Sequence, residues 1–129
     1  MPKLELFTAT VLVASLIAAC GREPQFDESY AKARENLHTP AGAQYDKQLA
    51  IFVRNLSGLS LALEDCVAKN PGKGEVHGYF EFKSATEYRV VLRPEDGFAA
   101  CITVELQNQS VPAPPQVPYL SPFDLDVRS

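Results

Sequence analysis

The stretch GEVHGYFEFKSATEYRVVLR, residues 74–93, decides the fold class of this chain. Its two halves each alternate between apolar and polar side chains, which is the period-two pattern of a half-buried β-strand. Because only the short link 83–85 separates the two halves, the stretch predicts an antiparallel hairpin. The apolar positions are Val76, Gly78, Phe80 and Phe82 in the first half, and Tyr88, Val90 and Leu92 in the second.

Helical patterns lie on both sides of this hairpin. Apolar residues recur at steps of three and four over about residues 44–69, which predicts one amphipathic helix that ends at Asn70-Pro71-Gly72. Gly58 lies inside this helix, where glycine costs about 1 kcal/mol relative to alanine and marks a position for a bend. Pro94 suits the first turn of a second helix, which is predicted to continue to about Gln107. The apolar residues of the first helix are Tyr45, Leu49, Phe52, Val53, Leu56, Leu59, Leu63, Cys66 and Val67.

A third strand is predicted at the C-terminal end of the chain. The five prolines in residues 110–122 favour a stiff, extended crossing, and residues 119–128 then alternate again. The order of elements predicts an α+β domain of two layers over residues 44–129, in which helices cover one face of a small antiparallel sheet. The apolar side chains of the third strand, which are predicted to contact a binding partner, are Tyr119, Phe123, Leu125 and Val127.

The N-terminal sequence MPKLELFTATVLVASLIAAC is typical of an export signal. Lys3 precedes a run without charge over residues 7–19, which is shorter than the roughly 20 residues of a membrane-spanning helix. The sequence Ile17-Ala18-Ala19-Cys20 is similar to the bacterial lipoprotein signal, which implies cleavage after residue 19 and lipidation of Cys20. Each CH₂ group of the acyl chains that enters the bilayer contributes about 0.8 kcal/mol to membrane binding. An ordinary cleaved signal and an uncleaved anchor are the alternatives.

Residues 20–43 are predicted to form a lipidated N-terminus and a polar tether, which holds the domain away from the membrane. A short helix over residues 28–37 is compatible with this tract. Gly21 stands where some relatives of the signal carry the aspartate that retains lipoproteins at the inner membrane. We therefore predict a lipoprotein of the bacterial outer membrane whose domain faces the periplasm.

Two cysteines remain once Cys20 is assigned to the lipid. Cys66 and Cys101 form an even pair in a compartment that permits disulfides, and a bridge between them is predicted. The chain-entropy model gives such a bridge a stabilisation of roughly 3–4 kcal/mol. The alternative is a metal site of both cysteines and His77, although no paired-ligand spacing such as C-x-x-C supports it.

Composition and motifs give no indication of an enzyme. The net charge is −4 and no basic face is evident, which argues against nucleic acid as a partner. The sequence lacks the G-x-S-x-G, H-E-x-x-H and P-loop patterns, and its two histidines, His38 and His77, are predicted to be exposed. We therefore predict no catalytic residues, no cofactor, no metal and no small-molecule substrate.

Residues 44–127 resemble the TonB C-terminal-like domains of the cell envelope, particularly the AgmX/PglI-type subgroup. In that family a helix with a cysteine is followed by an NP…GKV segment, a hairpin, a helix with a second cysteine, a proline-rich PAPP segment and a closing PF strand. The resemblance implies a non-enzymatic module that binds envelope proteins or peptides, sometimes by pairing its sheet edge with an incoming strand. The matching segments here are 63–66, 70–76, 98–102, 111–115 and 122–125.

Two functions follow as hypotheses. The first is an envelope lipoprotein whose domain binds proteins or peptides through residues 119–127 or through the edge of the hairpin. The second is a structural scaffold lipoprotein of an envelope or motility complex, without a peptide-binding edge. A binding module is expected to have an open sheet edge, whereas a scaffold is expected to expose an apolar patch on a helix.

Overall fold

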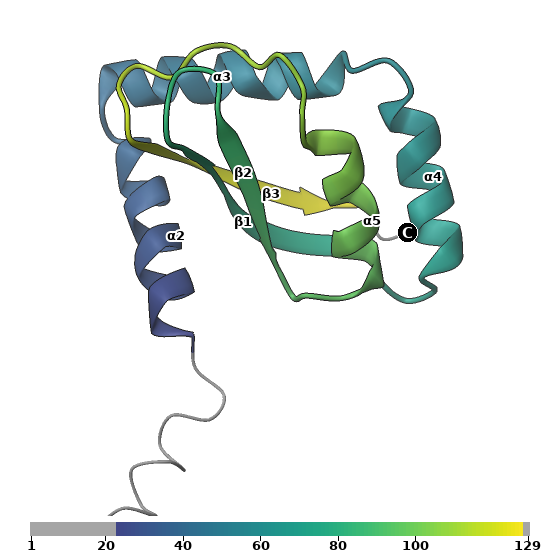
Figure 1. The fold of residues 1–129 in the computed structure, drawn as a ribbon. Coiled ribbons are helices and arrows are strands. Elements are labelled where there is room, and N and C mark those ends of the chain that lie inside the picture. The colour runs from purple at the N-terminus through teal and green to yellow at the C-terminus, as the bar shows by residue number, and fades with distance from the viewer. Residues whose placement is uncertain (1–22, 128–129) are drawn as a thin grey trace, which may run out of the picture.

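The computed structural model describes residues 23–127, which form a three-stranded sheet surrounded by helices (Figure 1). Among these residues no helix combines the length and the apolar composition that a membrane crossing needs. In chain order the elements are α2 (Pro24–Asn36), α3 (Pro40–Arg54), α4 (Leu59–Lys69), β1 (Glu75–Phe82), β2 (Tyr88–Arg93), α5 (Gly97–Leu106) and β3 (Tyr119–Asp126).

The hairpin predicted from residues 74–93 is confirmed. Strand β1 pairs antiparallel with β2 on one side and with β3 on the other, so the order in the sheet is β2-β1-β3. Phe80 in the middle of β1 lies opposite Val90 of β2 and Ser121 of β3. The third strand predicted from the C-terminal alternation completes the sheet, and the predicted α+β class is confirmed.

The prediction of a single helix over residues 44–69 is wrong, because two helices occupy this stretch. Helix α3 ends at Arg54 and α4 begins at Leu59. Gly58 between them has a φ of +83°, a left-handed conformation that glycine adopts without steric cost and that a continuous right-handed helix cannot contain. Helix α4 therefore turns away from α3 and packs against α5 (Figure 1).

The prediction of a polar tether is wrong from Pro24 onward, because α2 belongs to the folded domain. Phe26 and Ala33 of α2 are buried and pack with Tyr79 of β1, whose side chain lies on the face opposite to Phe80. Helices therefore cover both faces of the sheet, and the expectation of a single covered face is corrected. The tract is polar overall, but Phe26 and Ala33 lie two helical turns apart and so share one face of α2.

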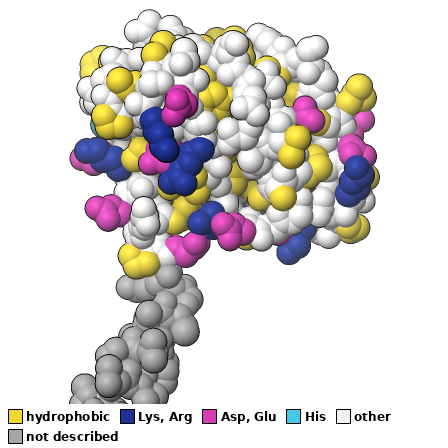
Figure 2. Space-filling view, viewed as in Figure 1, with side chains coloured by type: hydrophobic (Ala, Val, Ile, Leu, Met, Phe, Trp, Pro, Cys, Tyr) yellow, Lys and Arg dark blue, Asp and Glu magenta, His cyan; other side chains and the backbone are white. Residues whose placement is uncertain are grey.

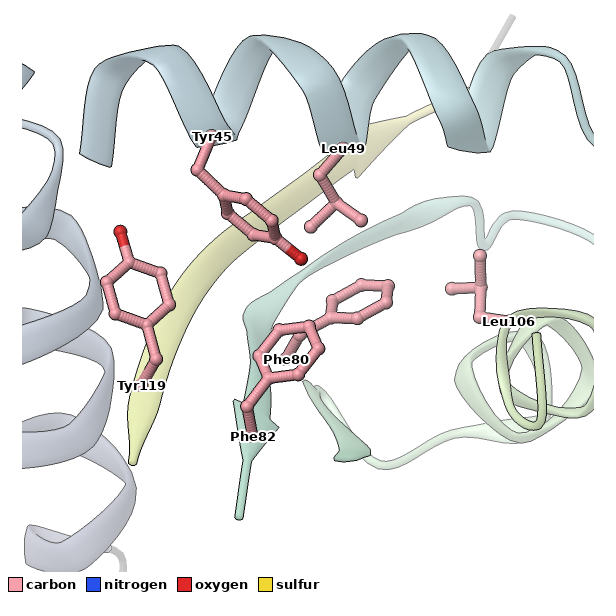
Figure 3. Close-up of a cluster of buried hydrophobic side chains, with 6 residues drawn as sticks. All are labelled: Tyr45, Leu49, Phe80, Phe82, Leu106 and Tyr119. Atoms are coloured by element: carbon pink, nitrogen blue, oxygen red, sulfur yellow. The ribbon is translucent and has the colours of Figure 1, made fainter. Parts of the chain in front are cut away.

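One core cluster lies between α3 and the sheet (Figure 3). Tyr45 and Leu49, one helical turn apart, point from α3 toward Phe80 and Phe82 of β1. Phe80 and Phe82 are fully buried, and burial of each such side chain contributes about 1.5–3 kcal/mol. Leu106 of α5 and Tyr119 of β3 complete the cluster.

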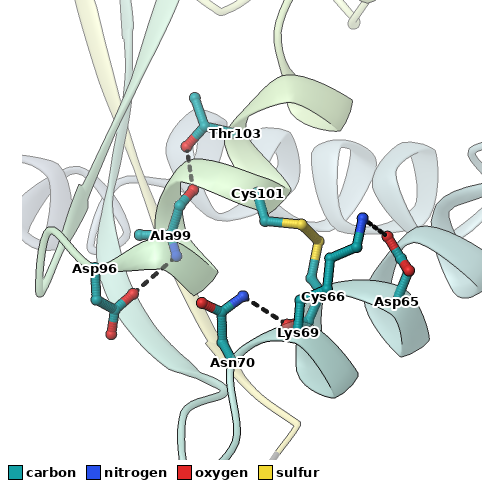
Figure 4. Close-up of a disulfide and its surroundings, with 8 residues drawn as sticks. All are labelled: Asp65, Cys66, Lys69, Asn70, Asp96, Ala99, Cys101 and Thr103. Carbon is teal, nitrogen blue, oxygen red and sulfur yellow. Dashed lines mark hydrogen bonds and ion pairs between the residues drawn. A yellow bond between two sulfur atoms is a disulfide. The ribbon is translucent and has the colours of Figure 1, made fainter.

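The predicted disulfide joins α4 to α5 (Figure 4). The sulfur atoms of Cys66 and Cys101 are 2.02 Å apart and their Cα atoms are 5.7 Å apart, within the range of an ordinary bridge. Beside it, the Asp96 carboxylate accepts a hydrogen bond of 2.9 Å from the N–H of Ala99 and caps the first turn of α5. His77 contacts the Phe26 and Tyr30 rings of α2, so the three residues of the alternative metal site do not come together.

Tyr45 makes the stability of the core sensitive to alkaline pH. Burial raises the pKa of its phenol well above the usual range, and nearby Tyr119 and Tyr88 add to the shift. Because the folded chain holds this proton more tightly than the unfolded chain, the stabilisation is complete below the unfolded pKa of about 10 and is lost above it. We expect the free energy of unfolding, measured by urea titration, to fall as the pH rises above about 10.

The matched variant is Tyr45→Phe, which removes the titrating group and the 2.7 Å hydrogen bond that its hydroxyl donates to the carbonyl oxygen of Pro112. This variant is expected to be about 1 kcal/mol less stable at neutral pH. Its stability is expected to fall less steeply than that of the wild type above about pH 10. Burial also raises the pKa of Tyr88 and of Tyr119, so part of the slope remains. Parallel pH profiles for the two proteins would contradict the assignment to Tyr45.

Candidate functional site

The four side chains predicted to contact a partner point toward the helices. Tyr119 is buried in the core, and Phe123, Leu125 and Val127 are half-buried against it. Alternation along β3 places all four on the sheet face that α3, α4 and α5 cover. Of these four side chains, Phe123 and Leu125 line a groove at the surface. The alternation that singled out these residues is therefore a signal of the core.

This first groove, the β3 groove, lies between β3 and helices α2, α3 and α4, with a volume of about 510 Å³. Its floor is mostly apolar, and Asp46 of α3 is partly buried in it. Burial raises the pKa of the Asp46 carboxyl, Asp124 raises it further, and Arg34 opposes the shift. Besides Phe123 and Leu125, the residues that line the groove are Arg34, Leu37, Asp46, Leu49, Ala50, Val53, Arg54, Leu59, Leu63, Pro122 and Asp124.

The outer edge of β3 is poorly suited to pair with another strand. Successive residues of β3 direct their backbone groups alternately toward β1 and away from it. The N–H of Val127 donates to the carbonyl of Gly74, so Val127 faces β1. Every second residue from Leu120 to Asp126 therefore has backbone groups that point outward. Pro122 occupies one of these outward positions and has no N–H to donate. The outward carbonyl of Leu120 already accepts a 2.8 Å hydrogen bond from the Asn36 side chain of α2. Proline at an outward position is a common way to block an edge strand.

The outer edge of β2 has a different character. The N–H of Lys83 donates to the carbonyl of Glu87, so the backbone of Glu87 faces β1. Because this direction alternates along an antiparallel strand, the backbone groups of Val90 and Leu92 point away from β1. The Val90 N–H donates to Oε1 of Gln107 at 2.8 Å, and the Leu92 carbonyl accepts from Nη1 of Arg93 at 2.9 Å. Within residues 23–127, the Val90 carbonyl and the Leu92 N–H have no hydrogen-bond partner.

A second groove, the β2 groove, runs along this edge and has a volume of about 590 Å³. Helix α5 forms its other wall with Ala99, Ala100 and Thr103, whose short side chains leave room beside the strand. A neighbouring strand requires a spacing of only about 4.7–4.9 Å from β2. The remaining lining residues are Arg89, Val90, Val91, Leu92, Arg93, Glu95 and Asp96.

The arginines of the β2 groove already have acidic partners. Arg89 pairs with Glu81, which lies opposite it on β1. Arg93 contacts Glu23 at 2.6 Å and Glu95 at 3.0 Å, and its hydrogen bond holds the pKa of Glu23 below the usual range. On the face shown in Figure 2, basic side chains likewise have acidic neighbours. The groove therefore offers backbone groups and small apolar side chains, and little net charge, to a ligand.

Neither histidine belongs to a site of this kind. His38 is exposed beyond the end of α2, and His77 packs on the aromatic rings of α2. Neither of them lines the β2 groove or the β3 groove.

The sequence predicts the hairpin edge only as one of two possible binding edges. It gives no indication that the Gln107 side chain contacts that edge.

Comparisons of the chain with protein-family models, with curated proteins and with solved structures find no match. The similarity to TonB C-terminal-like domains therefore stays a prediction. Function has to be argued from the site itself, because one fold can support many activities.

Proposed function

We propose that this protein is a lipoprotein of the bacterial envelope, anchored through Cys20, whose periplasmic domain binds extended segments of other envelope proteins without catalysis. The segment pairs with the outer edge of β2 and continues the sheet by one strand. The observation that carries this proposal is the β2 edge, where the Val90 carbonyl and the Leu92 N–H face a groove. The TonB-like resemblance of residues 44–127 points to the same mode of binding.

The β2 edge suits a backbone-directed interaction. A strand placed there forms main-chain hydrogen bonds with outward groups of β2, while its side chains on one face contact the short residues of α5. Main-chain bonds of this kind provide affinity, and the pockets for alternate side chains provide specificity. Because Arg89 and Arg93 are already paired, the mode does not depend on a charged ligand.

The lipid anchor is tested by the intact mass of the protein from a bacterial envelope fraction, alkylated without prior reduction. We expect a chain that lacks residues 1–19, carries acyl groups and takes up no alkylating reagent, since Cys66 and Cys101 are bridged. An unprocessed chain with alkylated thiols would contradict export and lipidation together.

The β2 edge is tested with the pair of variants Val90→Pro and Pro122→Val, which alter outward positions of the two opposite edges. The probe is a linear peptide selected on the wild-type protein from a displayed library and labelled with a fluorophore. Val90→Pro removes an outward N–H and is expected to weaken binding of the probe by about tenfold or more. Pro122→Val leaves β2 unchanged and is expected to keep the wild-type affinity. Anisotropy titrations give both values, and circular dichroism verifies that each variant is folded.

The reverse pattern, with affinity unchanged in Val90→Pro and altered in Pro122→Val, would move the site to β3. Failure to select any linear peptide would favour the scaffold hypothesis. One observation supports that second function: Leu61 of α4 and Val104 of α5 are 73% and 74% exposed on the two helices that the disulfide joins. In that case Leu61→Ser and Val104→Ser are expected to abolish co-purification with an envelope complex.

A further inference from the structure

Gln107 occupies a place on the β2 edge that a ligand would otherwise take. It follows directly after α5, and its Oε1 atom accepts a 2.8 Å hydrogen bond from the Val90 N–H. This N–H points outward from the sheet, so the side-chain carbonyl of Gln107 lies where the backbone carbonyl of an added strand would lie.

The backbone around Gln107 is held against β2 by Tyr88. The Tyr88 hydroxyl donates a 2.6 Å hydrogen bond to the carbonyl of Leu106 and accepts a 3.0 Å hydrogen bond from the N–H of Gln109. Leu106 and Gln109, which flank Gln107 and Asn108 in this loop, are thus tied to the strand independently of the Gln107 side chain. Rotation of that side chain alone can therefore release the Val90 N–H, while α5 keeps its position.

We infer that Gln107 is a built-in competitor of the ligand, and that an extended segment binds at β2 by displacing the Gln107 amide from Val90. This inference rests on the proposed function and deepens it, because it identifies a residue of this chain that sets the affinity of the site. The hydrogen bond to Gln107 protects the edge of the free protein, and the same bond must be broken before a strand can pair along its full length.

The displacement also defines the backbone chemistry of the ligand. In an antiparallel arrangement, the ligand residue opposite Val90 accepts from the Val90 N–H and donates its own N–H to the Val90 carbonyl. The ligand residue opposite Leu92 accepts from the Leu92 N–H in the same way. Gln107 satisfies only the Val90 N–H, so a bound strand makes further hydrogen bonds that the Gln107 side chain cannot make. The residue opposite Val90 must carry a backbone N–H, which excludes proline and N-methylated residues at that point.

The test compares Gln107→Ala, Gln107→Glu and the control Gln109→Ala in the full processed protein, with the labelled peptide selected on the wild type as probe. Gln107→Ala removes the competitor and is expected to tighten binding by about two- to tenfold. Gln107→Glu introduces a stronger acceptor for the Val90 N–H and is expected to weaken binding by a similar factor. The Gln109 side chain bonds the carbonyl of Glu105 and not the strand, so Gln109→Ala is expected to bind as the wild type does.

Hydrogen exchange at the Val90 amide provides a readout without ligand. The amide is expected to exchange faster in Gln107→Ala than in the wild type, because it has lost the bond to Gln107, and to become protected in Gln107→Ala when the peptide is bound. Equal peptide affinity in the wild type, Gln107→Ala and Gln107→Glu would overturn the role of Gln107 and leave strand addition at β2 in place. A peptide that binds to Gln107→Ala without protecting the Val90 amide would instead overturn the proposed function.

Discussion

The double variant Cys66→Ala, Cys101→Ala is expected to lose roughly 3–4 kcal/mol of the free energy of unfolding. The bridge spans 35 positions of sequence, and its absence lets the unfolded chain explore many more conformations. Domains of this size are stable by about 5–15 kcal/mol, so the loss is a large share of the total. Urea titration of the variant and the wild type at neutral pH measures the difference.

Reduction of the wild-type protein provides a second measure of the same bridge. Chemical reduction is expected to lower stability by a similar amount, and it should leave the double variant unaffected because that protein has no bridge to open. Helices α4 and α5 both contribute to the buried cluster around Cys66, so hydrogen exchange should accelerate first in these two helices. A double variant as stable as the wild type would contradict the structural role of the bridge.

Gly78→Ala is expected to cost about 3 kcal/mol or more, although it adds only one methyl group. Gly78 lies in the central strand β1, opposite Leu92 of β2 and Phe123 of β3. A Cβ atom at this position would lie 1.8 Å from the carbonyl oxygen of Val91 and 2.8 Å from its carbonyl carbon. Both contacts are with backbone atoms, so a side-chain rotation cannot relieve them and the two strands have to separate.

The control for this substitution is Gly72→Ala in the loop before β1. Gly72 has a φ of +79°, and no heavy atom lies within 4 Å of the position that its Cβ would take. Alanine there is strained only by its backbone conformation, at a cost of about 1–2 kcal/mol. Thermal unfolding of both variants distinguishes steric contact from backbone strain. A smaller loss in Gly78→Ala than in Gly72→Ala would show that β2 does not pass close to Gly78 in solution.

The strands of this fold could be predicted because apolar and polar side chains alternate along each of them. Residues 74–93 and 119–126 bury one face against α3, α4 and α5, so apolar side chains recur with a period of two. The break at Gly58 could not be predicted in the same way, because the apolar stripe continues through it at helical spacing. Only the backbone conformation of Gly58 distinguishes two helices from one.

The sequence gives no indication that α2 belongs to the domain, for a different reason. Its contribution to the core is small, with Phe26 and Ala33 as its buried residues, and polar contacts supply much of the remaining attachment. The Tyr30 hydroxyl donates to Asp124 at 2.6 Å, and Arg34 pairs with the same carboxylate at 3.1 Å. Contacts between residues so distant in the sequence produce no local sequence pattern. The polar composition of this helix therefore predicts a linker.

The candidate site was the least predictable part. Whether an edge can accept a strand depends on which backbone groups point outward, and a shift of one residue in register reverses that choice. Pro122 blocks β3 because its position faces outward, and Gln107 contacts Val90 because α5 ends beside β2. Neither fact can be inferred from residue types alone.

If Cys20 carries the proposed lipid, the pairing of Arg93 with Glu23 gives the β2 groove a direction relative to the bilayer. Arg93 is the last residue of β2, and Glu23 is three residues from the proposed lipid attachment at Cys20, a distance of at most about 11 Å. A protein held by that lipid has the Arg93 end of the groove near the membrane surface and the hairpin turn, about 20 Å further along the strand, toward the periplasmic space. In the lipid-anchored protein that we propose, the groove would lie within reach of proteins rooted in the same membrane, whose juxtamembrane segments would need no long linker.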